Sequence, residues 1–282
     1  MYNLSMRKYF RKHIAIPQDH GSWVFLLSPL LIGLFAGGTF KPESINLTIA
    51  ALGAFLLRQP VSMAVKAYAG RRSRNDLPAA RFWIIIYGTA ILVALAGLVK
   101  AGFSSLLYLA IPGIPVFAWH LALVSKRRER RQEGVEIIAT GVLSLTAPAA
   151  FWVGQGGYHA SGWWLWLLTW LQAAGSIVYA YLRLKQRSLP MTREQAQSLA
   201  RSEKWQMGQR AFAYTSFNLG LAVLLGWLGI IPAWIFVPFL VQWLETLWGV
   251  QNPATGLKPT AIGIRQMIVS IVWTILFILF WR

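Results

Sequence analysis

The sequence contains no cysteine, and only 9 of its 282 residues are acidic. Without cysteine the chain has no disulfide, no thiolate nucleophile and no cysteine-ligated metal. The four histidines are scattered, with no recognisable metal-ligand spacing. A glycine-rich phosphate-binding loop is also missing. The sequence therefore predicts neither a metal site nor a bound cofactor.

Basic and apolar residues dominate what is present. Lysine and arginine number 27, which gives a formal net charge of +18, and 56% of the chain is hydrophobic, including 15 tryptophans. Such a charge is also typical of nucleic-acid-binding proteins, but the long apolar runs leave no room for a basic soluble domain. A cationic face against the anionic leaflet of a membrane is the simpler interpretation. We therefore expect a multi-pass membrane protein with no nucleic-acid partner.

The apolar runs have the length of transmembrane helices. A bilayer core about 30 Å thick requires roughly 20 residues per helix, and lipid-exposed backbone must be hydrogen-bonded within the segment. The alternating polarity of a membrane β-barrel is not seen. We predict an all-α, polytopic helix bundle forming one domain over residues 1–282, with a basic tail at 1–20. About nine helices are expected, at 21–39, 46–68, 81–99, 102–124, 134–154, 161–184, 209–228, 231–249 and 264–281.

The distribution of charge predicts how the bundle is oriented. Nine spans would place the N-terminal tail on the same side as loops 69–80, 125–133, 185–208 and 250–263. That side, with the helix halves next to it, holds every lysine and arginine except Lys41, Lys100 and Arg282. The positive-inside rule makes it cytoplasmic, with the C-terminus outside. The short turns at 100–102 and 230–232 are the least certain divisions and leave a count of eight open.

Ionisable residues inside the predicted spans are costly and therefore mark candidate functional positions. Arg58 lies in the second predicted span, about 12 Å along the helix from Lys66. Ser62 falls between them at a spacing of four, so the three residues share one helical stripe, which Gln59 flanks. Snorkelling to the membrane surface explains Lys66, but it explains the deeper Arg58 poorly.

The sixth predicted span ends in a similar pattern, because Ser176, Tyr179 and Arg183 are spaced to share a face. His20 is interpreted either as a helix cap or as part of a ligand site, and His120 chiefly as a packing residue. Glu245 is expected to neutralise an arginine such as Arg58, or to tune a pocket. Polar residues expected at the same cytoplasmic depth are Gln18, Asp19, His20, His120, Glu136, Tyr214, Asn218 and Glu245.

Two segments carry a resemblance to known proteins. The stretches QDHGSWVFLLSPLLIGLFAGG and KAYAGRRSRNDLPAARFW resemble the YwiC-like family of bacterial membrane proteins, and the resemblance extends over nearly the whole chain. It implies a location in the bacterial inner (plasma) membrane or its equivalent. The arrangement is also similar, more distantly, to the UbiA-type membrane prenyltransferases. Those proteins have nine helices, a cytoplasmic N-terminus and two Asp-rich motifs at the cytoplasmic ends of the second and sixth helices.

The UbiA resemblance can be followed residue by residue. The segment at 74–78 falls where that superfamily has an Arg-Pro-Leu-Pro turn, and Tyr179-Ala180 matches a Tyr-Ala pair in the second motif. Lys126-Arg127 matches a basic pair after the fourth helix. The positions that are acidic or amidic in the two motifs are here Arg58, Gln59, Ser62 and Lys66, and then Ser176 and Arg183.

No aligned aspartate remains, and this departure decides what the resemblance implies. Mg²⁺ requires oxygen ligands, which arginine and lysine cannot supply, and Asp76 alone would not restore a site. Ordinary Mg²⁺-dependent prenyl transfer is therefore not expected. The first hypothesis is a UbiA-like pocket that binds an isoprenoid or lipid (di)phosphate directly through Arg58, Lys66 and Arg183. Whether it also catalyses a metal-independent transfer, with His20 or Tyr179 handling protons, is left open.

Two other classes of function fit the sequence. One is a non-catalytic scaffold that assembles with a membrane-protein partner. The other is a transporter, which is weaker, because no inverted repeat is visible and the polar residues lie toward one side instead of the midplane. The sequence names neither the lipid, the acceptor, the pathway nor the oligomeric state. Under the first hypothesis, Arg58 and Arg183 are expected in one cavity.

Overall fold

The computed structural model describes residues 9–17, 20–127 and 132–281, and in this part of the chain the regular secondary structure is all helical, with no β-strand. Short 3₁₀ turns at Arg74–Asp76, Ser104–Leu106 and Ala233–Ile235 precede α5, α6 and α13. The helices are α2 (Lys12–Ala15), α3 (His20–Ala36), α4 (Pro42–Tyr68), α5 (Leu77–Lys100), α6 (Leu107–Ala110), α7 (Gly113–Ser125), α8 (Glu133–Ser144), α9 (Thr146–Gln155), α10 (Ser161–Arg187), α11 (Arg193–Ser198), α12 (Arg201–Trp227), α13 (Phe236–Gln251) and α14 (Pro259–Phe280).

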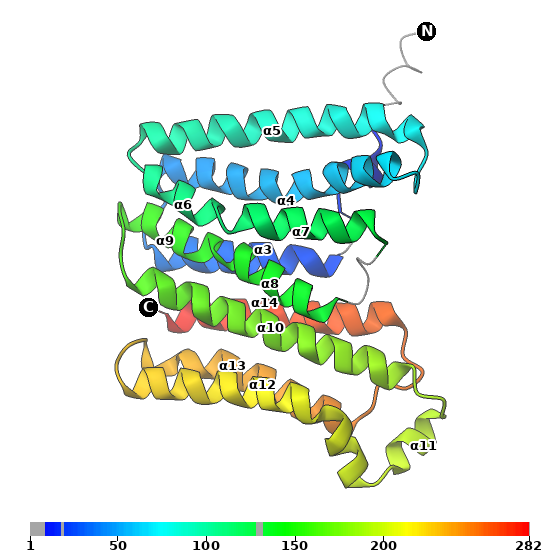
Figure 1. Cartoon of the computed structure of the whole chain (residues 1–282). Coiled ribbons are helices and arrows are strands. Elements are labelled where there is room, and N and C mark those ends of the chain that lie inside the picture. The colour runs from blue at the N-terminus through cyan, green and yellow to red at the C-terminus, as the bar shows by residue number, and fades with distance from the viewer. Residues whose placement is uncertain (1–8, 18–19, 128–131, 282) are drawn as a thin grey trace.

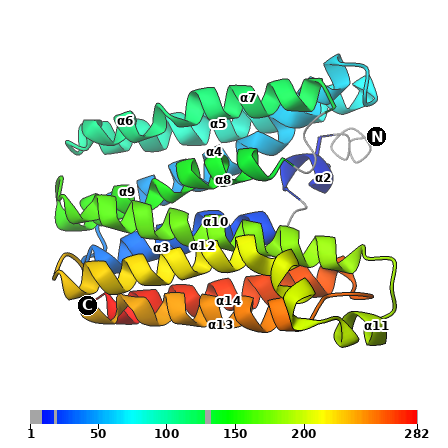
Figure 2. The same ribbon diagram turned by 60° about the horizontal axis from the view of Figure 1, so that its bottom comes forward.

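The long helices lie side by side and run back and forth, so that their connections gather at two ends of the bundle (Figure 1). One end, which we call the basic end, holds the connections at 69–76, 188–200 and 252–258, together with residues 126–127 and 132 (Figures 1 and 2). The opposite end holds 37–41, 101–106, 156–160 and 228–232. The loops predicted to share the basic side are thus at one end of the bundle.

Within the described residues, seven helical segments are long and apolar enough to cross a membrane. The multi-pass, all-α prediction is confirmed at that level. Two predicted spans are not among the seven: α3 is a shorter apolar helix over Gly21–Ala36, and α12 opens with the charged residues Arg201, Glu203 and Lys204. The seven are Pro42–Tyr68, Arg74–Lys100, Ser104–Ser125, Glu133–Gln155, Ser161–Arg187, Ala233–Gln251 and Pro259–Phe280.

Several predicted boundaries are corrected. The span at 134–154 is divided at Leu145 into α8 and α9, and the span at 102–124 is divided around Pro112 into α6 and α7. The helix predicted at 209–228 begins earlier, at Arg201, because helical structure extends beyond the apolar run. In the long loop, Thr192 caps the short helix α11 through a hydrogen bond from the Gln195 amide to its hydroxyl, at 3.3 Å.

Close backbone packing places α3 at the centre of the bundle. A Cβ atom at Gly33 would lie 2.2 Å from the Ala147 carbonyl oxygen, and one at Gly154 would lie 2.8 Å from Cα of Gly37. Glycines four residues apart allow two membrane helices to approach this closely. Helix α3 therefore packs directly on α9, and it also contacts α14, α8, α10 and α4. It forms one wall of the cavity described below.

Candidate functional site

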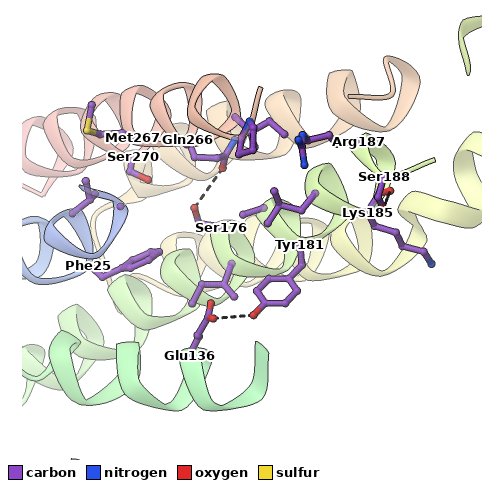
Figure 3. A pocket seen from close by; sticks show the side chains of 18 residues that line it. Phe25, Glu136, Ser176, Tyr181, Lys185, Arg187, Ser188, Gln266, Met267 and Ser270 are labelled. Atoms are coloured by element: carbon purple, nitrogen blue, oxygen red, sulfur yellow. Dashed lines mark hydrogen bonds between the residues drawn. The ribbon is translucent and has the colours of Figure 1, made fainter. Parts of the chain in front are cut away.

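A cavity of about 690 Å³ lies between α3, α8, α10 and α14, toward the basic end (Figure 3). Its volume is within the range of small-molecule binding sites, roughly 300–1,000 Å³. Most of its wall is apolar, with a few polar groups at defined positions. The lining residues are Gly21, Val24, Phe25, Glu136, Ser176, Ile177, Ala180, Tyr181, Leu184, Lys185, Arg187, Ser188, Pro259, Ile262, Gly263, Gln266, Met267 and Ser270.

The inner part of the cavity carries neutral polar groups. Ser176 on α10 and Gln266 on α14 form a long hydrogen bond of 3.5 Å across it (Figure 3). Ser270, one turn further along α14, accepts a hydrogen bond of 3.4 Å from the Gln172 amide. Both serine side chains are buried. They offer hydroxyl groups to an oxygen-bearing ligand without adding charge.

The end of α10 supplies cationic groups. Lys185, Arg187 and Ser188 line the cavity and are exposed, roughly 13–18 Å along the helix from Ser176. Nε of Arg187 donates to the Leu257 carbonyl at 2.8 Å, which ties the helix end to the loop before α14. In the described part of the chain, no carboxylate forms an ion pair with Lys185 or Arg187. This end of the cavity is therefore positively charged.

The opposite wall carries a carboxylate. Glu136 lies in the first turn of α8, and the Tyr181 hydroxyl on α10 donates to its Oε1 at 2.8 Å (Figure 3). Lining groups of both signs thus face one apolar space.

The sequence-predicted residues are placed differently. Ser176 lines this cavity, but Arg58, Lys66 and Arg183 do not. The structure does not bring Arg58 and Arg183 together. Arg58 is on α4 and Arg183 on α10, and α3 and α9 pack against both helices and lie between them (Figure 1). The expectation of one cavity shared by these two arginines is corrected for that reason.

Arg183 donates hydrogen bonds to backbone carbonyl groups at the end of another helix. Its side chain is buried, and Nη1 donates to the carbonyl oxygens of Gly249 at 2.7 Å and Asn252 at 2.6 Å. The same nitrogen donates to Oε1 of Gln186 at 2.9 Å. The last carbonyls of a helix have no partner within it, and a cation there also complements the helix dipole. Arg183 therefore caps the C-terminal end of α13.

Glu245 also has a partner other than the expected one. It pairs with Arg265 on α14, whose Nε and Nη2 donate to its two carboxylate oxygens at 2.7 Å each. The Tyr179 hydroxyl adds a third hydrogen bond to Glu245, at 2.9 Å. Trp248 lies against Arg265, with its ring centroid 3.6 Å from Cζ. Glu245 thus neutralises an arginine as expected, but the arginine is Arg265 and not Arg58, and the Tyr179 hydroxyl is engaged in the same network.

Of the residues predicted on α4, Arg58 has a contact within α4 and Gln59 has one with the N-terminal segment. The Arg58 guanidinium lies over the Phe55 ring, 5.3 Å from its centroid. Nε2 of Gln59 donates to the His13 carbonyl at 2.8 Å, which attaches α2 to α4. Ser62 is buried and Lys66 is in the last turn. The contacts of Gln59 thus hold the N-terminal segment against α4.

The remaining predicted residues are dispersed. The amide nitrogen of Asn218 donates to the Leu171 carbonyl at 2.7 Å, and Tyr214 lies under the Arg210 guanidinium. Lys126 and Arg127 are exposed after α7, and His120 is half-buried within it. Gln18, Asp19 and the His20 side chain fall outside the described residues. Among those described, no three acidic, histidine or cysteine side chains are grouped to hold a metal ion.

Sequence reasoning missed Lys185, Arg187 and Arg265. The first two were counted only as loop charge, although they follow Tyr181 and Leu184 on α10. Arg265 falls at the start of the last predicted span, directly before Gln266, and nothing in this position indicated a partner on α13. Only the packing of α10, α13 and α14 shows which charges meet.

Replacing Arg183 tests its role as a helix cap. Arg183→Met leaves three oxygen acceptors without their charged donor, and we expect the free energy of unfolding to fall by about 3 kcal/mol or more. Arg183→Lys retains the charge but lacks the guanidinium fork, so we expect its loss of stability to be smaller than that of Arg183→Met. The measurement is thermal unfolding of the purified protein in detergent. Arg210→Met is the matched control, because its ion pair with Glu133 is exposed and worth about 0–1 kcal/mol. Equal unfolding temperatures for R183M and R210M would contradict the assignment.

Comparison with known proteins supports the family resemblance. The family described as YwiC-like protein matches residues 16–151, which include α3, α4, α5 and the α8 wall of the cavity. The YwiC protein of Bacillus subtilis (strain 168) is 25% identical over 261 residues, covering 90% of this chain and 92% of that protein. No solved structure matches the chain. The predicted resemblance to the YwiC-like family is therefore confirmed, by a family match over residues 16–151 and by a similar relative over most of the chain.

Proposed function

We propose that the protein binds the anionic head of a membrane lipid, or of an isoprenoid phosphate, in the cavity between α3, α8, α10 and α14. One observation carries this proposal. Lys185 and Arg187 stand at the exposed end of an otherwise largely apolar cavity, and no described carboxylate pairs with either.

The chemistry of the lining fits an amphipathic anion. Guanidinium and ammonium groups form charge-assisted hydrogen bonds to phosphate oxygens. The apolar wall, with Val24, Phe25 and Met267, offers a surface for the first methylene groups of a lipid chain. The proposal retains the ligand class expected from the sequence but assigns it to other side chains. It is a proposal of binding, and no catalytic step is proposed.

We further propose nine membrane passes, in which α3 and α12 span the membrane beside the seven longer apolar segments. The basic end would then lie on the cytoplasmic side of a bacterial inner membrane. The alternating direction of the helices and the positive-inside rule support this arrangement. A UbiA-like fold is compatible with that topology and stays a prediction.

Neutralising the two cations tests the proposed site. We expect Lys185→Gln/Arg187→Gln to lower retention of anionic lipid by about ten-fold or more, since each charge-assisted hydrogen bond to the head is weakened. Native mass spectrometry of the detergent-purified protein, titrated with a short-chain phosphatidylglycerol, measures the retained lipid.

The matched control is Lys126→Gln/Arg127→Gln, which removes the same charge near the same end of the bundle but outside the cavity. We expect this variant to retain lipid like the wild type. Equal loss in both variants would show nonspecific attraction by the basic end, and full retention by the cavity variant would overturn the proposal. Retention of a co-purifying protein with no lipid loss would favour the scaffold hypothesis.

The absence of cysteine makes the topology directly testable, because single cysteines can be introduced into an otherwise unreactive chain. Tyr158→Cys lies at the opposite end and Gln197→Cys at the basic end, and both positions are exposed. In intact cells, a membrane-impermeant maleimide should label Tyr158→Cys alone, and both should react after lysis. Labelling of Gln197→Cys in intact cells would refute the proposed orientation.

A further inference from the structure

The cavity is lined by charges of both signs, which an ordinary anion-binding site does not require. Lys185 and Arg187 stand at the end of α10, whereas Glu136 belongs to the first turn of α8. In Figure 3, Glu136 lies across the cavity from Arg187, with Tyr181 between α10 and the carboxylate. A ligand in this space therefore meets a positive and a negative region.

The carboxylate has a defined orientation. The Tyr181 hydroxyl donates to Oε1 of Glu136 at 2.8 Å, and both side chains line the cavity. A carboxylate in such a place repels a purely anionic head. It attracts an ammonium group, and the neighbouring aromatic ring of Tyr181 is a second favourable surface for a cation.

Building on the proposed function, we infer that the preferred ligand is a zwitterionic lipid whose head carries a phosphate and a primary ammonium, as phosphatidylethanolamine does. The phosphate binds at Lys185 and Arg187, and the ammonium binds at Glu136 beside Tyr181. An ammonium supplies the hydrogen-bond donors that a carboxylate accepts. The other lining groups fit this pose.

Ser176, Gln266 and Ser270 lie further inward, and Ser176 is roughly 13 Å along α10 from Lys185. Serine hydroxyls can donate hydrogen bonds to a ligand oxygen without adding charge. The apolar side chains of Val24, Phe25 and Met267 line the same space as these polar groups and contact the beginning of the chains. The lining thus passes from charged groups at the exposed end to neutral groups between apolar walls, which suits a charged head followed by apolar chains.

The test compares three lipids of equal chain length on the purified, full-length protein. Phosphatidylethanolamine has both charges, N-acetyl-phosphatidylethanolamine retains only the phosphate charge, and phosphatidylglycerol has a different, anionic head. In competition titrations followed by native mass spectrometry, the wild type should prefer phosphatidylethanolamine over each of the others by about ten-fold. The acetylated lipid changes the ligand alone, so its result does not depend on how a variant folds.

Glu136→Gln is the informative variant, since it keeps the shape of the side chain and its capacity to accept from Tyr181. We expect E136Q to retain all three lipids about equally, through loss of the preference and not of binding. Wild-type protein that binds phosphatidylglycerol as well as phosphatidylethanolamine, or an E136Q variant with an unchanged preference, would overturn this inference while leaving the cavity proposal intact. Lipid retention that is insensitive to Lys185→Gln/Arg187→Gln would instead remove the proposed function itself.

Discussion

Charged and polar groups inside a membrane bundle must find their partners within the chain, because hydrocarbon supplies none. Arg183 is the clearest case. It is buried, and it satisfies the carbonyls at the end of α13 together with Gln186 of its own helix. The Glu245–Arg265 pair follows the same constraint, closed by the Tyr179 hydroxyl. These three helices, α10, α13 and α14, are thereby held at fixed positions relative to one another.

The same constraint separates structural charges from candidate binding charges. A buried cation that is already held by protein acceptors has little left to offer a ligand, as with Arg183, whose Nη1 donates to three oxygens and whose guanidinium lies over the Trp248 ring. Lys185 and Arg187 lie two and four residues further along α10, where the helix reaches the exposed end of the cavity. Two adjacent turns of one helix thus serve different purposes: the inner cation holds the bundle together, and the outer pair gives the cavity its charge.

Local sequence features predicted much of the helical architecture. Apolar length located the helices to within a few residues in most cases, and the spacing of basic loops predicted which connections share an end. The errors occurred where length and polarity give no signal. Nothing in the apolar run at 134–154 marks the division at Leu145, and the polar first turns of α12 hid its true start.

The candidate site was less predictable, and the reason is geometric. Helical spacing shows that Arg58 and Lys66, or Ser176 and Arg183, share a face, but it does not show which helix that face meets. That depends on packing between residues far apart in the chain, such as the glycine contact that places α3 against α9 and between α4 and α10. Ser176 lines the cavity, whereas Arg58, Lys66 and Arg183, with which it was expected to form a site, do not.

The central claim is that this cavity, with cations at one end and a carboxylate on the opposite wall, holds a lipid head. The most direct measurement is an electron cryo-microscopy map of the protein purified in its native lipids and reconstituted in nanodiscs. The account predicts head-group density between Lys185, Arg187 and Glu136, continuing as chain density along Phe25 and Met267. A cavity filled only by water, with ordered phosphate density at Arg58 instead, would contradict it.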